Sequence, residues 1–273
     1  MLEVTLNNGV KMPILGFGTY FPNLVETEES VYCALMNGYR HLDTARWYKN
    51  EDLVANAIRR SGVKREELFI TGKVESNGYE RTKKDILTTM NDLGVDYLDL
   101  LLIHWPSGND LDTYRCLEEF YREGKVRAIG LSNFNQRQCE EIISHCEIFP
   151  QVNQIETHIY FQEDKMHSFL QKVNIYHESW APFAEWYMGM LEDETLLKIA
   201  KKYKKNVAQV ILRFLIQQNI IVIPKSTKEG HIKENLDIFD FELSQEDFDR
   251  IRSLDRKEQY SPFPLCMKEE TNY

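Results

Sequence analysis

Short apolar runs alternate along the chain with stretches in which apolar residues recur every three to four positions. The short runs are typical of buried strands, and the longer stretches have the period of amphipathic helices. We predict strands at 14–18, 39–43, 67–72, 97–104, 126–131, 151–155, 174–180 and 220–223. We predict helices at 27–37, 50–61, 80–93, 112–123, 136–146, 163–172, 193–217 (two helices, broken near Asn206), 229–235 and 244–254.

Strands that are each followed by helix indicate a closed (β/α)₈ TIM barrel, an α/β fold that residues 1–273 would form as a single domain. Continuous apolar strands fit this fold because helices cover the outside of a parallel barrel. The opening segment predicts a β-hairpin around Asn8-Gly9 that caps the barrel bottom. The alternative is an open doubly wound sheet. It would require a GxGxxG turn after the first strand, and the segment from Gly16 to Phe21 lacks the third glycine.

Composition excludes several classes of partner. The net charge of −10 argues against non-specific binding to nucleic acid or to an anionic membrane surface. We see no signal peptide and no apolar run that approaches a membrane span, so we expect a cytoplasmic protein. We also expect it to act as a monomer or a weak dimer. No CxxC pair occurs, so we predict reduced thiols, no disulfide framework and no metal site. The cysteines are Cys33, Cys116, Cys139, Cys146 and Cys266.

Titratable residues follow three consecutive predicted strands. Asp43 and Tyr48 come after the second strand, Lys73 ends the third, and His104 ends the fourth. In (β/α)₈ barrels the active site lies at the carboxyl ends of the strands. We therefore expect these four side chains to meet at one end of the barrel and to form a proton-transfer site.

The chemistry of these residues suits the protonation of a developing negative charge on oxygen. A free tyrosine has a pKa of about 10, and a neighbouring ammonium such as that of Lys73 favours the phenolate and lowers this pKa. Asp43 would hold Lys73 charged and in place, and His104 would orient a substrate oxygen. Carbonyl reduction fits, with Tyr48 as the proton donor and a cofactor as the hydride donor.

Each of these four residues, taken alone, would more often have a purely structural role. A lysine or aspartate near a strand end is usually a surface ion pair, and a histidine or tyrosine there is usually a packing residue. The shared location of all four favours a site. A barrel hydrolase with paired carboxylates would need a second acid beside Asp43, and Glu156 and Glu178 belong to other predicted strands.

Several motifs in order resemble those of the aldo-keto reductase superfamily, from the N-terminal hairpin to about residue 255. The overall length is similar to that of compact bacterial reductases of 2,5-diketo-gluconate and methylglyoxal. The matching stretches are LGFGT (15–19), GYRHLDTARWYKNE (38–51), FITGKV (69–74), YLDLLLIHWP (97–106), VRAIGLSNF (126–134), VNQIETHIYFQ (152–162), ESWAPFAE (178–185) and IVIPKSTKEGHIKENLDIFDF (221–241).

This resemblance implies an oxidoreductase acting on CH–OH groups, with NADPH/NADP⁺ as cofactor and Asp43, Tyr48, Lys73 and His104 as its catalytic tetrad. The family hydrogen-bonds the nicotinamide carboxamide at the positions of Ser132, Asn133 and Gln154, and stacks an aromatic ring on the nicotinamide at Trp180. It binds the adenosine 2′-phosphate and adenine at Lys225, Ser226, Thr227, Glu234 and Asn235. The other positions assigned to the cofactor are Gly18, Thr19, Tyr20, Asp43, Ala181, Pro182, Phe183 and His231.

The chain also departs from the family pattern. His231 stands where an arginine is frequent, and histidine lacks the guanidinium fork, so we expect NADPH to be preferred with reduced discrimination against NADH. Gly72 stands where serine or threonine is common, which would remove a side chain near the site. Tyr20, Trp47 and Trp105, with His104, are expected to form an aromatic pocket for a small aldehyde or ketone.

A second hypothesis comes from the same resemblance. The superfamily includes channel accessory subunits and lens proteins that bind cofactor with little turnover. The complete tetrad favours the enzyme over such a structural relative. Cofactor oxidation with a panel of aldehydes distinguishes the two.

Overall fold

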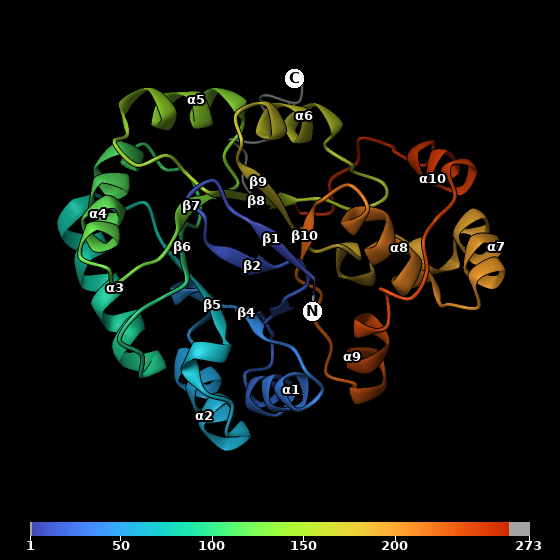
Figure 1. The fold of residues 1–273 in the computed structure, drawn as a ribbon, viewed down its shortest axis with the longest axis horizontal. Coiled ribbons are helices and arrows are strands. Elements are labelled where there is room, and N and C mark those ends of the chain that lie inside the picture. Colours follow the sequence, from blue (N-terminus) through green and yellow to red (C-terminus); the bar gives the residue numbers. More distant parts are fainter. Residues whose placement is uncertain (1, 262–273) are drawn as a thin grey trace.

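The computed structural model describes residues 2–261, which form a barrel of eight parallel strands with helices outside it (Figure 1). A parallel bridge between Leu15 and Val222 joins the first barrel strand to the last and closes the ring. The predicted (β/α)₈ TIM barrel is therefore confirmed, and the open doubly wound sheet is wrong. The barrel strands are β3 (Phe17–Gly18), β4 (His41–Asp43), β5 (Phe69–Val74), β6 (Leu100–Ile103), β7 (Ile129–Ser132), β8 (Val152–Glu156), β9 (Tyr176–Trp180) and β10 (Ile221–Val222).

The N-terminal hairpin lies at the bottom of the barrel, as predicted. Strand β1 (Glu3–Thr5) pairs antiparallel with β2 (Lys11–Pro13). In the turn between them, the Asn7 side chain donates hydrogen bonds to the carbonyls of Pro150 (2.8 Å) and Asn174 (2.9 Å). These carbonyls precede β8 and β9, so the hairpin is held against the amino-terminal ends of the strands and leaves the opposite end open.

The helices surround the barrel in chain order, except for the last one, which packs beside the seventh (Figure 1). Each predicted helical stretch contains a helix, with ends that differ from the prediction by at most two residues. The helices are α1 (Val25–Met36), α2 (Glu51–Ser61), α3 (Tyr79–Leu93), α4 (Asp110–Arg122), α5 (Gln136–His145), α6 (Asp164–Lys172), α7 (Glu194–Tyr203), α8 (Val207–Ile216), α9 (Glu229–Leu236) and α10 (Gln245–Arg252), and the short 3₁₀ helices are η1 (Arg46–Tyr48), η2 (Arg65–Glu67), η3 (Ala184–Trp186) and η4 (Met190–Glu192).

The break predicted near Asn206 separates α7 from α8. Lys204 adopts a left-handed conformation (φ 56°) and ends α7. Asn206 then caps α8 reciprocally: its side chain accepts a hydrogen bond from the backbone N–H of Gln209 (2.8 Å), and the Gln209 side chain accepts one from the backbone N–H of Asn206 (2.9 Å). The asparagine therefore starts the second helix as well as interrupting the pattern.

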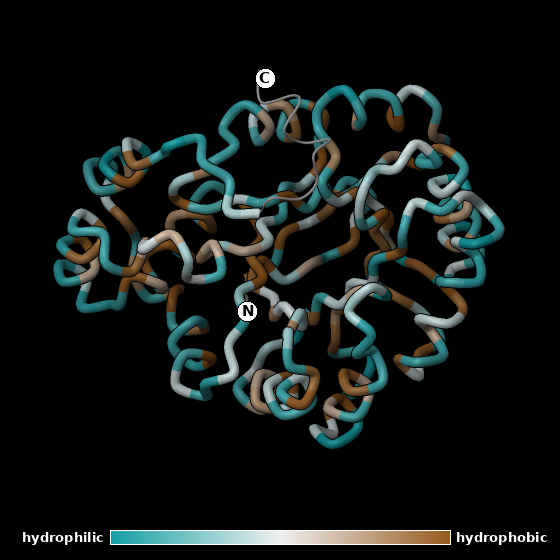
Figure 2. Tube along the Cα trace, turned by 180° about the vertical axis from the view of Figure 1, so that it is seen from behind, coloured by the Kyte–Doolittle hydropathy of each residue, from teal (hydrophilic) through white to brown (hydrophobic). Residues whose placement is uncertain are grey.

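Hydrophobic residues gather on the strands and on the inner sides of the helices (Figure 2). All six residues of β5 are buried, as expected for a strand that is covered on both faces. Within residues 2–261, no helix is long and apolar enough to cross a membrane. The described cysteines, Cys33, Cys116, Cys139 and Cys146, are free thiols, and Cys266 lies outside the described residues.

A buried carboxylate joins the amino-terminal ends of three barrel strands. Asp99 is fully buried immediately before β6. Its oxygens accept hydrogen bonds from Arg65 Nη2 (2.6 Å), from Arg127 Nη1 (2.6 Å) and from the backbone N–H of Ile70 in β5 (2.9 Å). Two guanidinium groups and a backbone donor thus compensate the loss of hydration of this charge, and they connect the segments before β5, β6 and β7.

Asp99→Asn should lower the free energy of unfolding by about 3 kcal/mol, because it leaves two guanidinium groups without their shared counter-ion. Urea unfolding followed by circular dichroism measures the change. The matched control is Asp85→Asn, which removes the half-buried partner of the exposed Arg81 on α3 and should change stability by less than about 0.5 kcal/mol. Equal effects of the two substitutions would contradict the assigned role of Asp99.

Candidate active site

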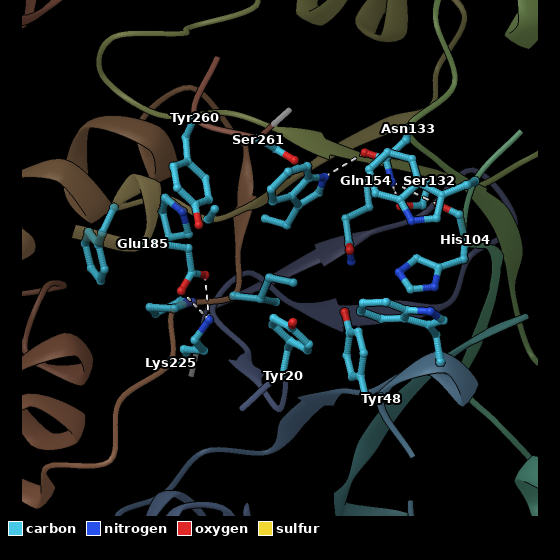
Figure 3. Close-up of a pocket in the computed structure, with 18 of the residues that line it drawn as sticks. Tyr20, Tyr48, His104, Ser132, Asn133, Gln154, Glu185, Lys225, Tyr260 and Ser261 are labelled. Carbon is cyan, nitrogen blue, oxygen red and sulfur yellow. Dashed lines mark hydrogen bonds and ion pairs between the residues drawn. The ribbon is translucent and has the colours of Figure 1, made fainter. Parts of the chain in front are cut away.

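A cavity of about 650 Å³ opens at the carboxyl ends of the strands, opposite the hairpin. Figure 3 shows Tyr48 and His104 at one side of it and Lys225 with Glu185 at the other. Most of the side chains predicted for the site line this cavity: Tyr20, Trp47, Tyr48, His104, Trp105, Ser132, Asn133, Gln154, Trp180, Ala181, Pro182, Phe183 and Lys225.

Asp43 and Lys73 form a buried ion pair directly behind Tyr48. The Lys73 ammonium donates to Asp43 Oδ1 and also lies 3.3 Å from the carbonyl oxygen of Thr44. Lys73 is fully buried and Asp43 is 1% exposed. The two residues meet because β4 and β5 pair in parallel, with Asp43 opposite Thr71 and Lys73 two residues further along β5. Asp43 and Lys73 thus meet at the carboxyl ends of the strands, as the sequence predicted.

Tyr48 reaches the pair from η1, which follows β4. Its hydroxyl lies 3.3 Å from Lys73 Nζ. The turn that presents it ends at Lys49, which has a left-handed backbone (φ 55°). Part of the Tyr48 side chain remains open to the cavity, where its ring packs edge-on to that of His104 with 5.7 Å between ring centres. The tyrosine is therefore accessible to a small molecule on one side and to an ammonium on the other.

The electrostatics correct one prediction. Burial raises the pKa of the Tyr48 phenol to about 12, and the ammonium of Lys73 opposes this shift without reversing it. Burial also disfavours the charge on Lys73, but the adjacent Asp43 carboxylate outweighs that effect and holds the pKa of the ammonium above its ordinary value. Tyr48 is thus protonated and Lys73 charged at neutral pH. The expected net lowering of the tyrosine pKa is wrong because desolvation of the phenolate is the larger effect.

His104 is paired with a carboxylate that the sequence pattern did not single out. Its Nδ1 lies 3.2 Å from Oε1 of Glu75, and His104 is 6% exposed. Burial lowers the pKa of His104 below its ordinary value, although Glu75 acts in the opposite direction. A signal for Glu75 was present: it follows Lys73 by two positions, and alternate residues of a strand point to the same face.

Gln154 connects the ion pair to a second buried carboxyl group. Its side-chain nitrogen donates to Asp43 Oδ2 (2.9 Å) and to Glu178 Oε2 (2.9 Å). Burial, followed by repulsion from Asp43, raises the pKa of Glu178 to about 8, so that this carboxyl group is mostly protonated at neutral pH. The Lys73 ammonium thus faces a single carboxylate, that of Asp43, and the net charge of this buried cluster is close to zero.

Trp180 is oriented by the loop that follows β7. Its indole N–H donates to Oδ1 of Asn133 (2.8 Å), while Nδ2 of Asn133 donates to the carbonyl of His104 (3.0 Å) and to Oγ of Ser132 (3.0 Å). The Asn133 amide is therefore engaged with protein groups in this structure. Asn133 (φ 65°) and Ala181 (φ 47°) both adopt left-handed backbones just beyond the strand ends. Strain of this kind persists where the surrounding structure holds a site in place.

Lys225 forms an ion pair across the far side of the cavity. Its ammonium lies 2.5 Å from each oxygen of Glu185 and 5.2 Å from the centre of the Tyr20 ring. Glu185 comes from the loop after β9, and the sequence did not predict its contact with Lys225. A phosphate group that binds Lys225 would have to share the ammonium with this carboxylate.

The other residues assigned to the cofactor lie outside the cavity lining. Thr19 is buried, with its hydroxyl donating to the carbonyl of Asp43 (3.0 Å), and a Cβ at Gly18 would lie 2.9 Å from the carbonyl oxygen of Ile223. Gly18 therefore permits close approach of two strands. Asn235 is buried, Ser226 is partly exposed, and Thr227, His231 and Glu234 are exposed.

Gly72 corrects another expectation. A Cβ at this position would face Leu98 (3.2 Å) and Thr89 (3.6 Å), which lie on the helical side of the barrel wall. Glycine here leaves space between β5 and its helix, and a larger residue would not have pointed into the cavity. The absence of a serine or threonine at this position therefore takes no side chain from the site.

Aromatic rings form much of the cavity wall. The rings of Tyr20 and Trp47 stack with 5.8 Å between their centres, and Trp105 packs edge-on against Trp180 at 6.2 Å. Tyr260, which the sequence did not point to, also lines the cavity. Buried Glu156 accepts a hydrogen bond from the backbone N–H of Tyr260 (2.5 Å) and so holds this residue at the cavity.

The catalytic end of the cavity can donate a proton to an oxygen and stabilise the resulting phenolate with an adjacent ammonium. Among residues 2–261, no group of three or more histidine, cysteine or acidic side chains is arranged to hold a metal ion. Two carboxyl groups do approach each other at Gln154, but both are buried behind the cavity wall. The arrangement therefore favours proton transfer over hydrolysis by paired carboxylates.

Comparison with known proteins gives a consistent assignment. The chain is 48% identical over 265 residues to the glyoxal reductase of Bacillus subtilis (96% of this chain, 95% of that protein), and 34% identical over 264 residues to a methylglyoxal reductase of Escherichia coli (96% of each). An aldo-keto reductase from a deep-sea metagenome superposes with a TM-score of 0.92 at 44% identity (94% of this chain, 96% of that chain).

A second solved structure, the aldo-keto reductase of Bombyx mori in complex with NADP, has a TM-score of 0.89 at 31% identity and covers 100% of this chain and 97% of its own. The model of the aldo/keto reductase family matches residues 15–256. The chain is an oxidoreductase and belongs to the aldo/keto reductase family.

Proposed function

We propose that the protein reduces small aldehydes and ketones to alcohols with NADPH, and that Tyr48 donates the proton. The observation that carries this proposal is the contact of 3.3 Å between the Tyr48 hydroxyl and the buried Lys73 ammonium. Burial keeps the phenol protonated before reaction, and the ammonium stabilises the phenolate that remains after the proton has left. Asp43 keeps that ammonium charged.

The cavity has room and suitable groups for a nicotinamide cofactor. Trp180 offers a ring held by Asn133, the Ser132 hydroxyl and Gln154 lie beside it, and Lys225 offers a cation at the far side. When bound, the cofactor supplies hydride. The complex of the Bombyx mori relative with NADP supports NADPH, and the carbonyl substrates in the names of the bacterial relatives support a small carbonyl compound.

The remaining lining residues act on the substrate. Neutral His104 presents an imidazole nitrogen beside Tyr48, where it can orient the substrate oxygen. Tyr20, Trp47 and Trp105 supply apolar walls, although Trp47 is 58% exposed and Tyr20 is 39% exposed. This open aromatic mouth suits a small carbonyl compound. The proposed alternative is a cofactor-binding relative with little turnover, and no turnover of any aldehyde with cofactor bound would support it.

Tyr48→Phe should lower kcat for aldehyde reduction by about a thousandfold, since it removes the proton donor and keeps the ring. Cofactor binding, measured by quenching of tryptophan fluorescence, should stay within about twofold because the phenol holds no part of the cofactor site in this proposal. Near-normal turnover in this variant would exclude Tyr48 as the donor.

The two directions of the reaction should respond differently to pH. With a pKa of about 12, Tyr48 stays protonated, so kcat/KM for reduction should be nearly constant from about pH 7 to about pH 10. Alcohol oxidation requires the phenolate, so its kcat/KM should rise up to about tenfold per pH unit over that range. Steady-state rates in both directions test this. A reduction rate that halves near neutral pH would contradict the high pKa.

NADPH should be preferred over NADH by only about fivefold in kcat/KM, because Lys225 is already paired with Glu185. Lys225→Met should abolish the preference by lowering the NADPH value, and Glu185→Gln should increase it by freeing the ammonium. The kcat/KM for NADH serves as the internal control and should change little in both variants. Equal use of both cofactors by the unaltered protein, or a preference for NADH, would refute the assignment.

A further inference from the structure

The charged side chains that line the cavity are distributed unevenly. Lys225 and Glu185 compensate each other on one side. Glu75 lines the catalytic side, where its hydrogen-bond partner is the uncharged His104. Lys73 lies behind that wall and is matched by Asp43. Among the described residues that line the cavity, Glu75 therefore contributes an uncompensated negative charge at the catalytic end.

Glu75 is placed to act on the substrate. It contacts His104, whose ring packs against that of Tyr48, so the carboxylate lies one imidazole ring away from the proposed proton donor. Its side chain is 35% exposed, so solvent screens the carboxylate only in part. A substrate whose carbonyl oxygen approaches Tyr48 must bring its neighbouring atoms close to this charge.

Resting on the function proposed above, we infer that Glu75 selects substrates by charge: the enzyme favours neutral and cationic carbonyl compounds and rejects those with a carboxylate next to the carbonyl. An incoming carboxylate would meet a like charge and aromatic walls, because the ammonium of Lys73 is already paired with Asp43 and that of Lys225, at the far side, with Glu185. Charge selection by Glu75 would restrict the substrates to carbonyl compounds without a carboxylate. Short oxo acids and diketo-sugar acids would therefore be poor substrates.

The test compares substrates that differ in charge but little in shape. Glyoxal and glyoxylate form a neutral and anionic pair, and 3,3-dimethylbutanal and betaine aldehyde form a neutral and cationic pair. In Glu75→Gln, whose amide oxygen can still accept the hydrogen bond from His104, kcat/KM for glyoxylate should rise about tenfold relative to glyoxal. The value for betaine aldehyde should fall about tenfold relative to 3,3-dimethylbutanal.

The matched control is Glu80→Gln, which makes the same change in net charge at an exposed position on α3 outside the cavity lining. It should leave both ratios of kcat/KM unchanged.

A measurement on the unaltered enzyme avoids any effect of substitution on folding. Raising NaCl from about 0.02 M to about 0.5 M should bring kcat/KM for glyoxylate closer to that for glyoxal, because salt screens the charge of Glu75.

Opposite shifts for the anion and the cation would support the inference, because a purely structural role for Glu75 would change all four substrates by the same factor. Such a common factor in Glu75→Gln, or ratios that do not respond to salt in the unaltered enzyme, would overturn it and leave the proposed function intact. Failure of the unaltered enzyme to reduce either neutral aldehyde would refute the proposed function, and this inference with it.

Discussion

The buried ion pair between Lys73 and Asp43 is the interaction on which the rest of the site depends. An ammonium with no solvent exposure is tolerated only beside a counter-ion, since an unpaired buried charge costs several kcal/mol. The barrel meets this requirement by pairing β4 with β5 in parallel, which places Asp43 opposite Thr71 and close to Lys73. The neighbouring groups then adjust to the pair: Gln154 donates to Asp43, and Glu178 holds a proton so that no second negative charge accumulates.

This pair also determines what Tyr48 can do. A buried phenol alone would be a very weak acid, because nothing would stabilise its anion. With Lys73 at 3.3 Å, the hydroxyl remains protonated at rest while a favourable environment for the phenolate is already in place. A proton donor needs both properties.

Much of the fold could be read from local pattern. Short apolar runs located all eight barrel strands, and the capping asparagine at Asn206 located the boundary between α7 and α8. The predicted ends of the strands were less accurate. The run 97–104 predicted a long strand, but β6 covers Leu100–Ile103. Backbone hydrogen bonds do continue on both sides of β6: Leu98 forms a parallel bridge with Val126, and the backbone N–H of His104 donates to the carbonyl of Val74 (2.8 Å). The predicted run therefore marks the buried, hydrogen-bonded segment, and only its central part is a regular strand.

The sequence by itself determined the order of strands and helices and the four titratable residues at the strand ends, because both depend on periodicity and position along the chain. Only the tertiary structure decided which groups compensate those charges. The pairing of Glu75 with His104 joins adjacent strand ends, and that of Glu185 with Lys225 joins loops 40 residues apart. Burial, which sets the pKa of Tyr48, is likewise a property of the assembled barrel. Contacts and desolvation between distant segments leave no periodic signal in the chain.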